Sequence, residues 1–456
     1  MRIFLAIALL TALALVATSP KRYGLRRMRP VVVLAAGGYA AIAVGAALGP
    51  AGLDFIAREA VTASQPLLVL CLGWVGLTLG LQVRREVLSK LPIGVWVATG
   101  ADVLTSAAVG FGVGVLGLAF WIGGAGVEGL DGIRSTLEAW GSGGSGGAGV
   151  SGGRGGLGGL TLGAGLLACA MMGWAMETRS LRPSDDQATR RLELLVRSCG
   201  ALAGVVAAGA FGVLAALWTR DEGGAVLLDA PGAGVRLAAT AATAVGVALV
   251  GKLGLALAGK SQGDRLVVFL GVVAFVAGVS VQVGTPPILA GLLLGVTLAN
   301  VPGPDLRAFE RFILKTEHMV AVFLGLLTGL VLSPAVGVGM LSLAAWLTVA
   351  RFVVKPLLFR VLTRKLVAGR AGGGALPDRS AVWIAPVRQA PVALALAVSL
   401  AVLDPSEFHG RLVTVVVLTG LFSDLTPAVA SAVRRRLHTG PAVGEAAREM
   451  ERGADG

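Results

Sequence analysis

The sequence predicts an all-α polytopic membrane protein with about thirteen transmembrane helices, and three observations support this prediction. Of its 456 residues, 55% are hydrophobic and only 14% are charged, and the mean hydropathy of +0.81 is higher than a soluble domain shows. Apolar runs of about 17 to 25 residues, the length that crosses a bilayer, recur along the chain. The short alternating segments of an outer-membrane barrel are absent from the sequence. Helices therefore satisfy the backbone in lipid.

Thirteen apolar runs give the predicted spans in order. They are centred near Leu10, Ala40, Gly76, Ala107, Leu167, Val206, Val245, Val273, Leu293, Leu326, Val349, Leu394 and Val417. The first run also has the length of a signal-peptide core, but one Arg precedes it and five basic residues follow it. That order of charge is the reverse of a signal peptide, so we interpret the first run as a span.

Basic residues gather in every second connection between the runs. Examples from the seven basic connections are Arg26, Arg84, Arg190, Arg265, Arg311, Arg364 and Arg435. The intervening connections are acidic or nearly neutral. Because basic loops stay in the cytoplasm, the sequence predicts a multi-pass plasma-membrane protein with its N-terminus outside and its C-terminus in the cytoplasm. These loops also account for the formal charge of +13, so no nucleic-acid partner is predicted.

Two segments have the composition of non-spanning chain. Residues 141–159 are rich in Gly and Ser and are expected to form a flexible external loop. Residues 438–456 form a short cytoplasmic tail. The transmembrane domain is therefore expected to cover residues 1–437.

The sequence carries no pattern for catalysis, a metal or a cofactor. The three Cys residues lie inside apolar runs and the three His residues lie far apart, so neither type has the spacing of a metal site. A phosphate-binding Walker loop, a zinc-protease HExxH motif and a GxSxG elbow are also absent. We therefore expect neither an enzyme nor a bound cofactor.

Several charged residues lie inside predicted spans, and a charge costs roughly 2.5 to 3.5 kcal/mol at the bilayer centre. Arg351 lies about nine residues, or roughly 13 Å, from the cytoplasmic end of its span. Asp102 lies about as deep in the fourth span, and Asp424 is the other deep carboxylate. Lys355 lies nearer the boundary, so its side chain is expected to extend to the membrane surface. Asp102, Asp424 and Arg351 are thus the candidate functional charges.

A broken helix is predicted around Arg388 and Gln389. These two polar residues lie between Pro386 and Pro391 in an otherwise apolar segment. Proline interrupts the hydrogen bonds of a helix. Transporters use such interrupted helices to direct free backbone groups at a site in the middle of the membrane. Arg388 and Gln389 are therefore candidates to face a substrate.

Three segments resemble the monovalent cation:proton antiporter superfamily, a group of sodium or potassium/proton exchangers. GAALGPAGLDFI (Gly45 to Ile56), with the helix that follows it, is similar to the opening of that family. VQVGTPPILAGLLLGVTLANV (Val281 to Val301) resembles a central element of the family. APVALALAVSLAVLDPSEFHGRLVTVVVLTGLFSDLTP (Ala390 to Pro427) resembles its last two helices. The three segments occur in the family's order over nearly the whole chain.

The resemblance implies an inverted-repeat antiporter-like fold with a core domain, a scaffold domain and assembly as a homodimer. Scaffold spans would lie in residues 1–90 and 233–333, and core spans in 92–219 and 337–433. It also implies that protons and a monovalent cation, Na⁺ or K⁺, compete for carboxylates in the membrane. In the family a Lys or Arg of the eleventh helix often pairs with one of these carboxylates, and Arg351 falls in that helix.

The sixth predicted helix departs from the family pattern. Ala203 and Gly204 occupy the positions where the family carries its carboxylate pair, and Leu194 to Leu214 contains no acidic residue. The usual proton and cation site is therefore absent.

An arginine buried in the membrane needs a compensating group, and the sequence leaves three kinds open for Arg351. They are a relocated carboxylate, first Asp102 and then Asp424; an anionic substrate shared with Arg388; or water and backbone carbonyls at a broken helix. The leading hypothesis is a cation:proton antiporter with a non-standard ion site. A non-transporting scaffold or sensor and an anion transporter are the alternatives.

Overall fold

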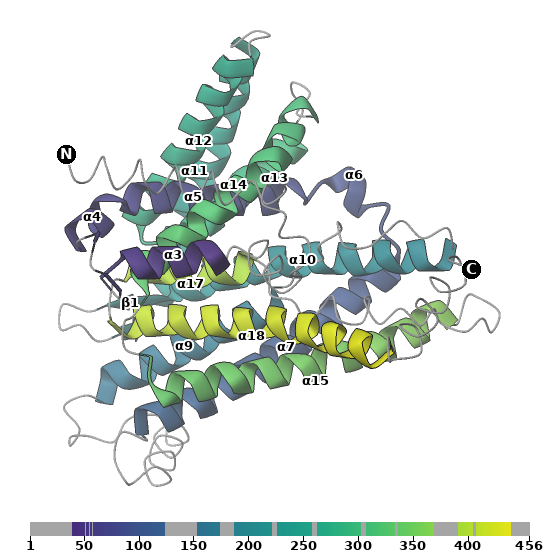
Figure 1. Ribbon diagram of the computed structural model, residues 1–456. Coiled ribbons are helices and arrows are strands. Elements are labelled where there is room, and N and C mark those ends of the chain that lie inside the picture. The colour runs from purple at the N-terminus through teal and green to yellow at the C-terminus, as the bar shows by residue number, and fades with distance from the viewer. Residues whose placement is uncertain are drawn as a thin grey trace, which may run out of the picture.

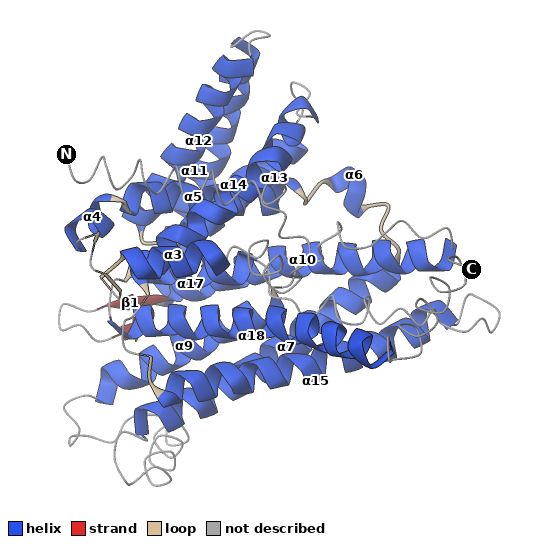
Figure 2. Ribbon diagram, in the orientation of Figure 1, coloured by secondary structure: helices blue, strands red, loops and turns tan. Residues whose placement is uncertain are grey.

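The computed structural model describes residues 39–50, 52–53, 55–56, 58–123, 153–173, 187–220, 226–257, 262–301, 307–332, 336–368, 391–404 and 407–438. In this part of the chain the protein is helical apart from one short antiparallel hairpin (Figure 2). The helices are α3 (Tyr39–Leu48), α4 (Arg58–Ala63), α5 (Gln65–Leu81), α6 (Arg85–Leu88), α7 (Ile93–Gly123), α9 (Gly153–Met172), α10 (Gln187–Leu217), α11 (Ala230–Leu257), α12 (Gln262–Val283), α13 (Pro287–Asn300), α14 (Arg307–Val331), α15 (Val338–Ala368), α17 (Pro391–Leu403) and α18 (Glu407–His438). The hairpin strands are β1 (Trp218–Arg220) and β2 (Val226–Leu228).

Six helices are long and apolar enough to cross a membrane: the candidate spans lie in α7, α10, α11, α12, α15 and α18. Six further apolar segments of 10 to 17 residues lie in α3, α5, α9, α13, α14 and α17. Every predicted span centre except Leu10 lies inside one of these twelve helices, and Leu10 lies outside the described residues. The protein is therefore a helical, multi-pass membrane protein whose partner is the lipid bilayer.

The start of α9 differs from the predicted loop. The helix begins at Gly153, so residues 153–159 are helical instead of part of a flexible linker, and residues 141–152 lie outside the described part. The segment is poor in helix-forming residues, but it is continuous with the apolar run that packs in the protein core. Tertiary packing explains why a glycine-rich start is helical.

Glycines bring two pairs of helices into backbone contact. A Cβ atom at Gly76 of α5 would overlap the carbonyl of Ile288 in α13, and one at Gly291 would overlap the carbonyl of Gly73. The same arrangement joins α3 to α14, where a Cβ at Gly45 would overlap the backbone of Leu326. Small residues at helix interfaces are typical of membrane proteins, because close packing replaces the hydrophobic effect there.

A sharp turn separates α12 from α13. Gly284 has a φ of 79°, which is costly for any residue with a side chain, and Pro287 opens α13 immediately afterwards. Proline suits the first turn of a helix because the N–H that it lacks has no partner there. The turn brings α13 back against α5.

Six helices from two separate parts of the sequence form the bundle that holds the deep charges. In this bundle α7 packs on α9 and α15, α15 packs on α18, and α9 contacts α10 and α17. Figure 1 shows α7, α9, α15 and α18 running in similar directions in the lower half, whereas α11 and α12 rise steeply above them. The last turn of α9 lies against the first turn of α17, since a Cβ at Gly173 would touch Val392.

Candidate functional site

Helix α15 carries its two deep cations on its buried face. Arg351 and Lys355 are four residues apart, so they lie one above the other on the same side of the helix. Both side chains are 0% exposed. The opposite side exposes Trp346 and Val353. A helix with an apolar exposed face and charges inside has the arrangement expected of a membrane helix that borders a polar interior.

Lys355 forms a buried ion pair with Asp102 of α7. Its Nζ lies 2.9 Å from both Oδ1 and Oδ2 of the carboxylate, and both side chains are fully buried. Ser106, one turn further along α7, donates its hydroxyl to Oδ1 at 3.4 Å. The pair therefore links α7 to α15 inside the bundle, away from water.

Arg351 binds the C-terminal end of α9. Its Nη1 donates to the carbonyl of Ala170 at 3.1 Å, and its Nη2 donates to the carbonyl of Gly173 at 2.6 Å. Lys355 also reaches this end, with its Nζ 3.4 Å from the carbonyl of Met172. The last carbonyls of a helix have no partner within the helix and carry a partial negative charge. The two cations of α15 therefore neutralise a buried helix end.

Asp424 is the other deep carboxylate predicted from the sequence. It lies on α18, which packs on α15, and it is 4% exposed. Asp424 is therefore a second buried carboxylate in the bundle that holds Arg351 and Lys355.

The prediction that the side chain of Lys355 extends to the membrane surface is wrong. The ammonium turns into the bundle because the carboxylate of Asp102 lies opposite it at the same level. The sequence held a signal for this arrangement in the four-residue spacing from Arg351, which places both cations on one face. For the placement of the Lys355 side chain, this spacing is the better guide than the position of Lys355 near the predicted end of the span.

Arg351 binds backbone carbonyls at a helix end, which are one of the compensating groups predicted for it. Asp102, the first carboxylate predicted for Arg351, pairs with Lys355. Arg388 and Gln389 lie outside the described residues.

The positions of the missing carboxylate pair lie in packed surroundings. Ala203 and Gly204 are buried in α10, and a Cβ at Gly204 would make ordinary contacts with Leu79 of α5 and Val392 of α17. This part of α10 therefore faces aliphatic side chains.

Across the described ranges, no three His, Cys, Asp or Glu side chains gather as a metal site would require. The sequence matches no family model and no curated protein. The resemblance to the cation:proton antiporters therefore rests on the sequence segments quoted above and stays a prediction.

Proposed function

We propose that the protein is a secondary transporter that exchanges a monovalent cation, Na⁺ or K⁺, for protons. The observation that carries this proposal is the fully buried ion pair between Asp102 and Lys355. Ionisable residues inside a membrane bundle are costly, and they commonly mark ion pathways and proton relays. Asp102 would take the role of the carboxylates that are missing at Ala203 and Gly204.

The chemistry of the pair suits competition for one carboxylate. An ammonium group is a compact charge on a flexible stem, so Lys355 can leave Asp102 when a proton or a cation neutralises the carboxylate. Ser106 supplies a hydroxyl oxygen beside Asp102, and oxygen atoms are the ligands that hard cations prefer. Arg351 is fixed by two carbonyls, so it is expected to hold the end of α9 in place during the exchange. Lys355 thus takes the competing role that the sequence suggested for Arg351.

We also propose the inverted-repeat fold that the sequence resemblance implies. The twelve apolar helices, with a first span at residues 1–20, would make thirteen. The contacts among α7, α9, α10, α15, α17 and α18 fit a core domain made of residues 92–219 and 337–433. We further propose a homodimer in the plasma membrane, with the N-terminus outside.

Flux measurements in proteoliposomes test this function. A pH gradient is imposed, Na⁺, Li⁺ or K⁺ is added in turn, and proton movement is recorded for the wild type and for Asp102→Asn. The matched control is Asp229→Asn, because Asp229 forms an ion pair of 3.1 Å with Arg236 at the start of α11, where the carboxylate is 36% exposed. We expect cation-dependent proton movement that Asp102→Asn abolishes and that Asp229→Asn leaves intact.

Two results would contradict the proposal. The first is a folded wild-type protein that moves no protons with any of the three cations. The second is an Asp102→Asn variant with wild-type exchange, which would exclude Asp102 as the carrier carboxylate.

A non-transporting scaffold or sensor is the second candidate function. The observation that favours it is the pair of hydrogen bonds from Arg351 to the end of α9, which is a structural role, together with the absence of carboxylates at Ala203 and Gly204. It predicts no ion-dependent flux and a large loss of stability when Arg351 is replaced. An anion transporter that uses Arg351 and Arg388 is the third candidate, and flux that depends on the anion but not on the cation would identify it.

A further inference from the structure

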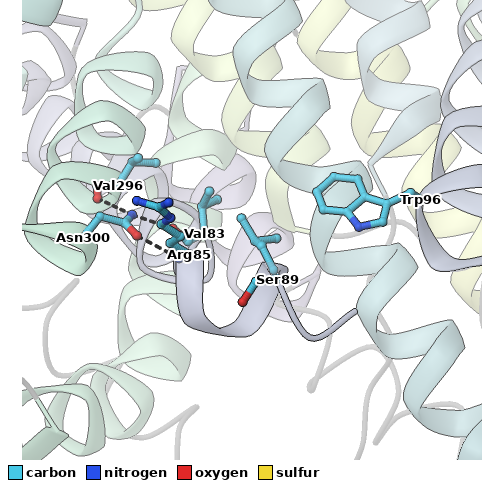
Figure 3. Close-up of a pocket in the computed structure, with 7 residues that line it drawn as sticks. Val83, Arg85, Ser89, Trp96, Val296 and Asn300 are labelled. Carbon is cyan, nitrogen blue, oxygen red and sulfur yellow. Dashed lines mark hydrogen bonds between the residues drawn. The ribbon is translucent and has the colours of Figure 1, made fainter. Parts of the chain in front are cut away.

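A cavity of about 630 Å³ lies where three apolar helices end or begin. Its lining residues come from the end of α5 and the connection to α7, from the first turn of α7, and from the last turn of α13: Val83, Arg85, Leu88, Ser89, Trp96, Val296 and Asn300. In Figure 3, Arg85, Val83 and Asn300 form one side, Trp96 stands on the other, and Ser89 lies between them. One side of the cavity is polar and basic, and the other is aromatic.

The polar wall of the cavity is held in place by Asn300. Its Oδ1 accepts the backbone N–H of Arg85 at 2.8 Å, and its Nδ2 donates to the carbonyls of Val83 and Val296 at 2.7 and 2.8 Å. These bonds tie the connection after α5 to the last turn of α13. The wall is therefore formed before any ligand binds, which lowers the cost of binding.

The guanidinium of Arg85 is available to a ligand. Arg85 is an exposed residue, and within the described part of the chain its side chain makes no hydrogen bond or ion pair. A guanidinium offers a planar set of N–H donors that matches the oxygens of a phosphate. The exposed Ser89 also lines the cavity, and its hydroxyl donates to the carbonyl of Glu86 at 3.3 Å, a long bond that a phosphate oxygen can replace. The polar side thus presents a cation, and a hydroxyl that can turn towards an anion.

The aromatic side continues onto an exposed apolar surface. Trp96 is 45% exposed, and its neighbours Ile93 and Val97 on α7 are 73% and 54% exposed. The candidate span in α7 starts at Ile93, while α5 and α13 end beside it. The cavity therefore lies at the level where the apolar helices meet the polar connections, which is the level of lipid headgroups. Tryptophan is enriched at that level because its ring is apolar and its N–H is polar.

We propose that this cavity binds an anionic phospholipid, with the phosphate of its headgroup on Arg85 and Ser89 and an acyl chain along Trp96 and the exposed surface of α7. The exposed guanidinium of Arg85 attracts a phosphate, and the adjoining apolar surface distinguishes a lipid from a soluble phosphate. Basic pockets between membrane helices are known sites for anionic headgroups. This inference does not depend on the transport activity.

Quenching of Trp96 fluorescence by lipids with brominated acyl chains tests the proposal on the full-length protein in detergent. The signal of Trp96 is the difference between the wild type and Trp96→Phe, since the chain has eight Trp residues. Brominated phosphatidylglycerol and brominated phosphatidylcholine are titrated separately. We expect saturable quenching by phosphatidylglycerol, and about a fivefold rise in its half-saturating concentration for Arg85→Gln. Brominated phosphatidylcholine should require a similarly higher concentration with the wild type.

Lys90→Gln is the matched control, because Lys90 is exposed in the same connection but does not line the cavity. It should leave the half-saturating concentration of phosphatidylglycerol unchanged. Equal losses for Arg85→Gln and Lys90→Gln would show general surface attraction and would overturn the site. Equal quenching by the two lipids with the wild type would also overturn it. Displacement of the lipid by inorganic phosphate at a similar concentration would identify a soluble anion as the ligand instead.

Discussion

Replacing Lys355 with methionine should destabilise the protein strongly, and replacing Asp102 at the same time should restore much of the loss. Methionine keeps the length of the lysine stem and removes its charge. In the single variant the carboxylate of Asp102 stays buried between α7 and α15 without the ammonium that lies 2.9 Å from each of its oxygens. The variant therefore tests how much of the fold depends on the pair.

The size of the effect follows from the burial and the distance. Two unit charges 2.9 Å apart attract by about 6 kcal/mol at an effective dielectric constant of about 20, and the removal of both groups from water offsets most of this gain. Breaking a buried pair by removing one partner costs about 3 to 5 kcal/mol. Asp102→Asn combined with Lys355→Met leaves two neutral groups, so we expect the single changes to be coupled by about 2 to 3 kcal/mol.

Unfolding of the wild type, the two single variants and the double variant in mixed micelles, with increasing SDS, measures the four free energies. The reasoning is refuted if the costs of the single changes simply add in the double variant. It is also refuted if Lys355→Met alone costs less than about 1 kcal/mol, which is the range of an exposed ion pair.

Two further changes have outcomes that the same unfolding assay can check. Arg351→Gln should lower the free energy of unfolding by at least about 3 kcal/mol, since it removes two charged hydrogen bonds of about 1.5 to 3 kcal/mol each. A loss below about 1 kcal/mol would contradict the role of Arg351 at the end of α9. Gly76→Ala should cost about 1 to 3 kcal/mol or more, because the new methyl group would overlap the carbonyl of Ile288 and push α5 from α13. Gly234→Ala is the matched control, because a Cβ at Gly234 meets no atom within 4 Å. This change should leave stability unchanged or raise it by up to about 1 kcal/mol. Equal losses of stability at the two glycines would refute the packing argument.

The helices were predictable because apolar length carries most of the information in a membrane protein. The predicted centres at Ala107, Val206 and Val349 lie well inside α7, α10 and α15, since each run is bounded by polar connections. The start of α9 was not predictable in this way. Glycine is a poor helix former, and only the packing of the following residues explains a helix that begins at Gly153.

The sequence predicts how deep the charged residues of the site lie along their spans, but it does not predict the direction in which their side chains point around the helix. The position of a charge along a span predicts its depth, and Asp102, Asp424 and Arg351, which were chosen on that ground, are all buried in the structure. The direction of a side chain around the helix depends on which neighbour it meets, and a single sequence does not contain that information. Lys355 was assigned to the membrane surface because it lies nearer the end of its span, although the turn of helix that separates it from Arg351 places both on one face.

The two cations of α15 differ in type, and their partners differ to match. A guanidinium presents a rigid fork of donors, which fits the two carbonyls of Ala170 and Gly173. An ammonium is a single charge that can be released from a carboxylate more easily.

If release of Lys355 is a step of exchange, then Lys355→Arg should hold Asp102 by two parallel hydrogen bonds, leave the protein folded, and lower the rate of cation-dependent proton movement in proteoliposomes at least tenfold. Arg351→Lys serves as the comparison, because it should lower stability through the loss of one carbonyl bond while the Asp102 pair keeps its ammonium. Exchange by Lys355→Arg at the wild-type rate would refute a mechanism in which Lys355 must leave Asp102, and the pair would then be structural.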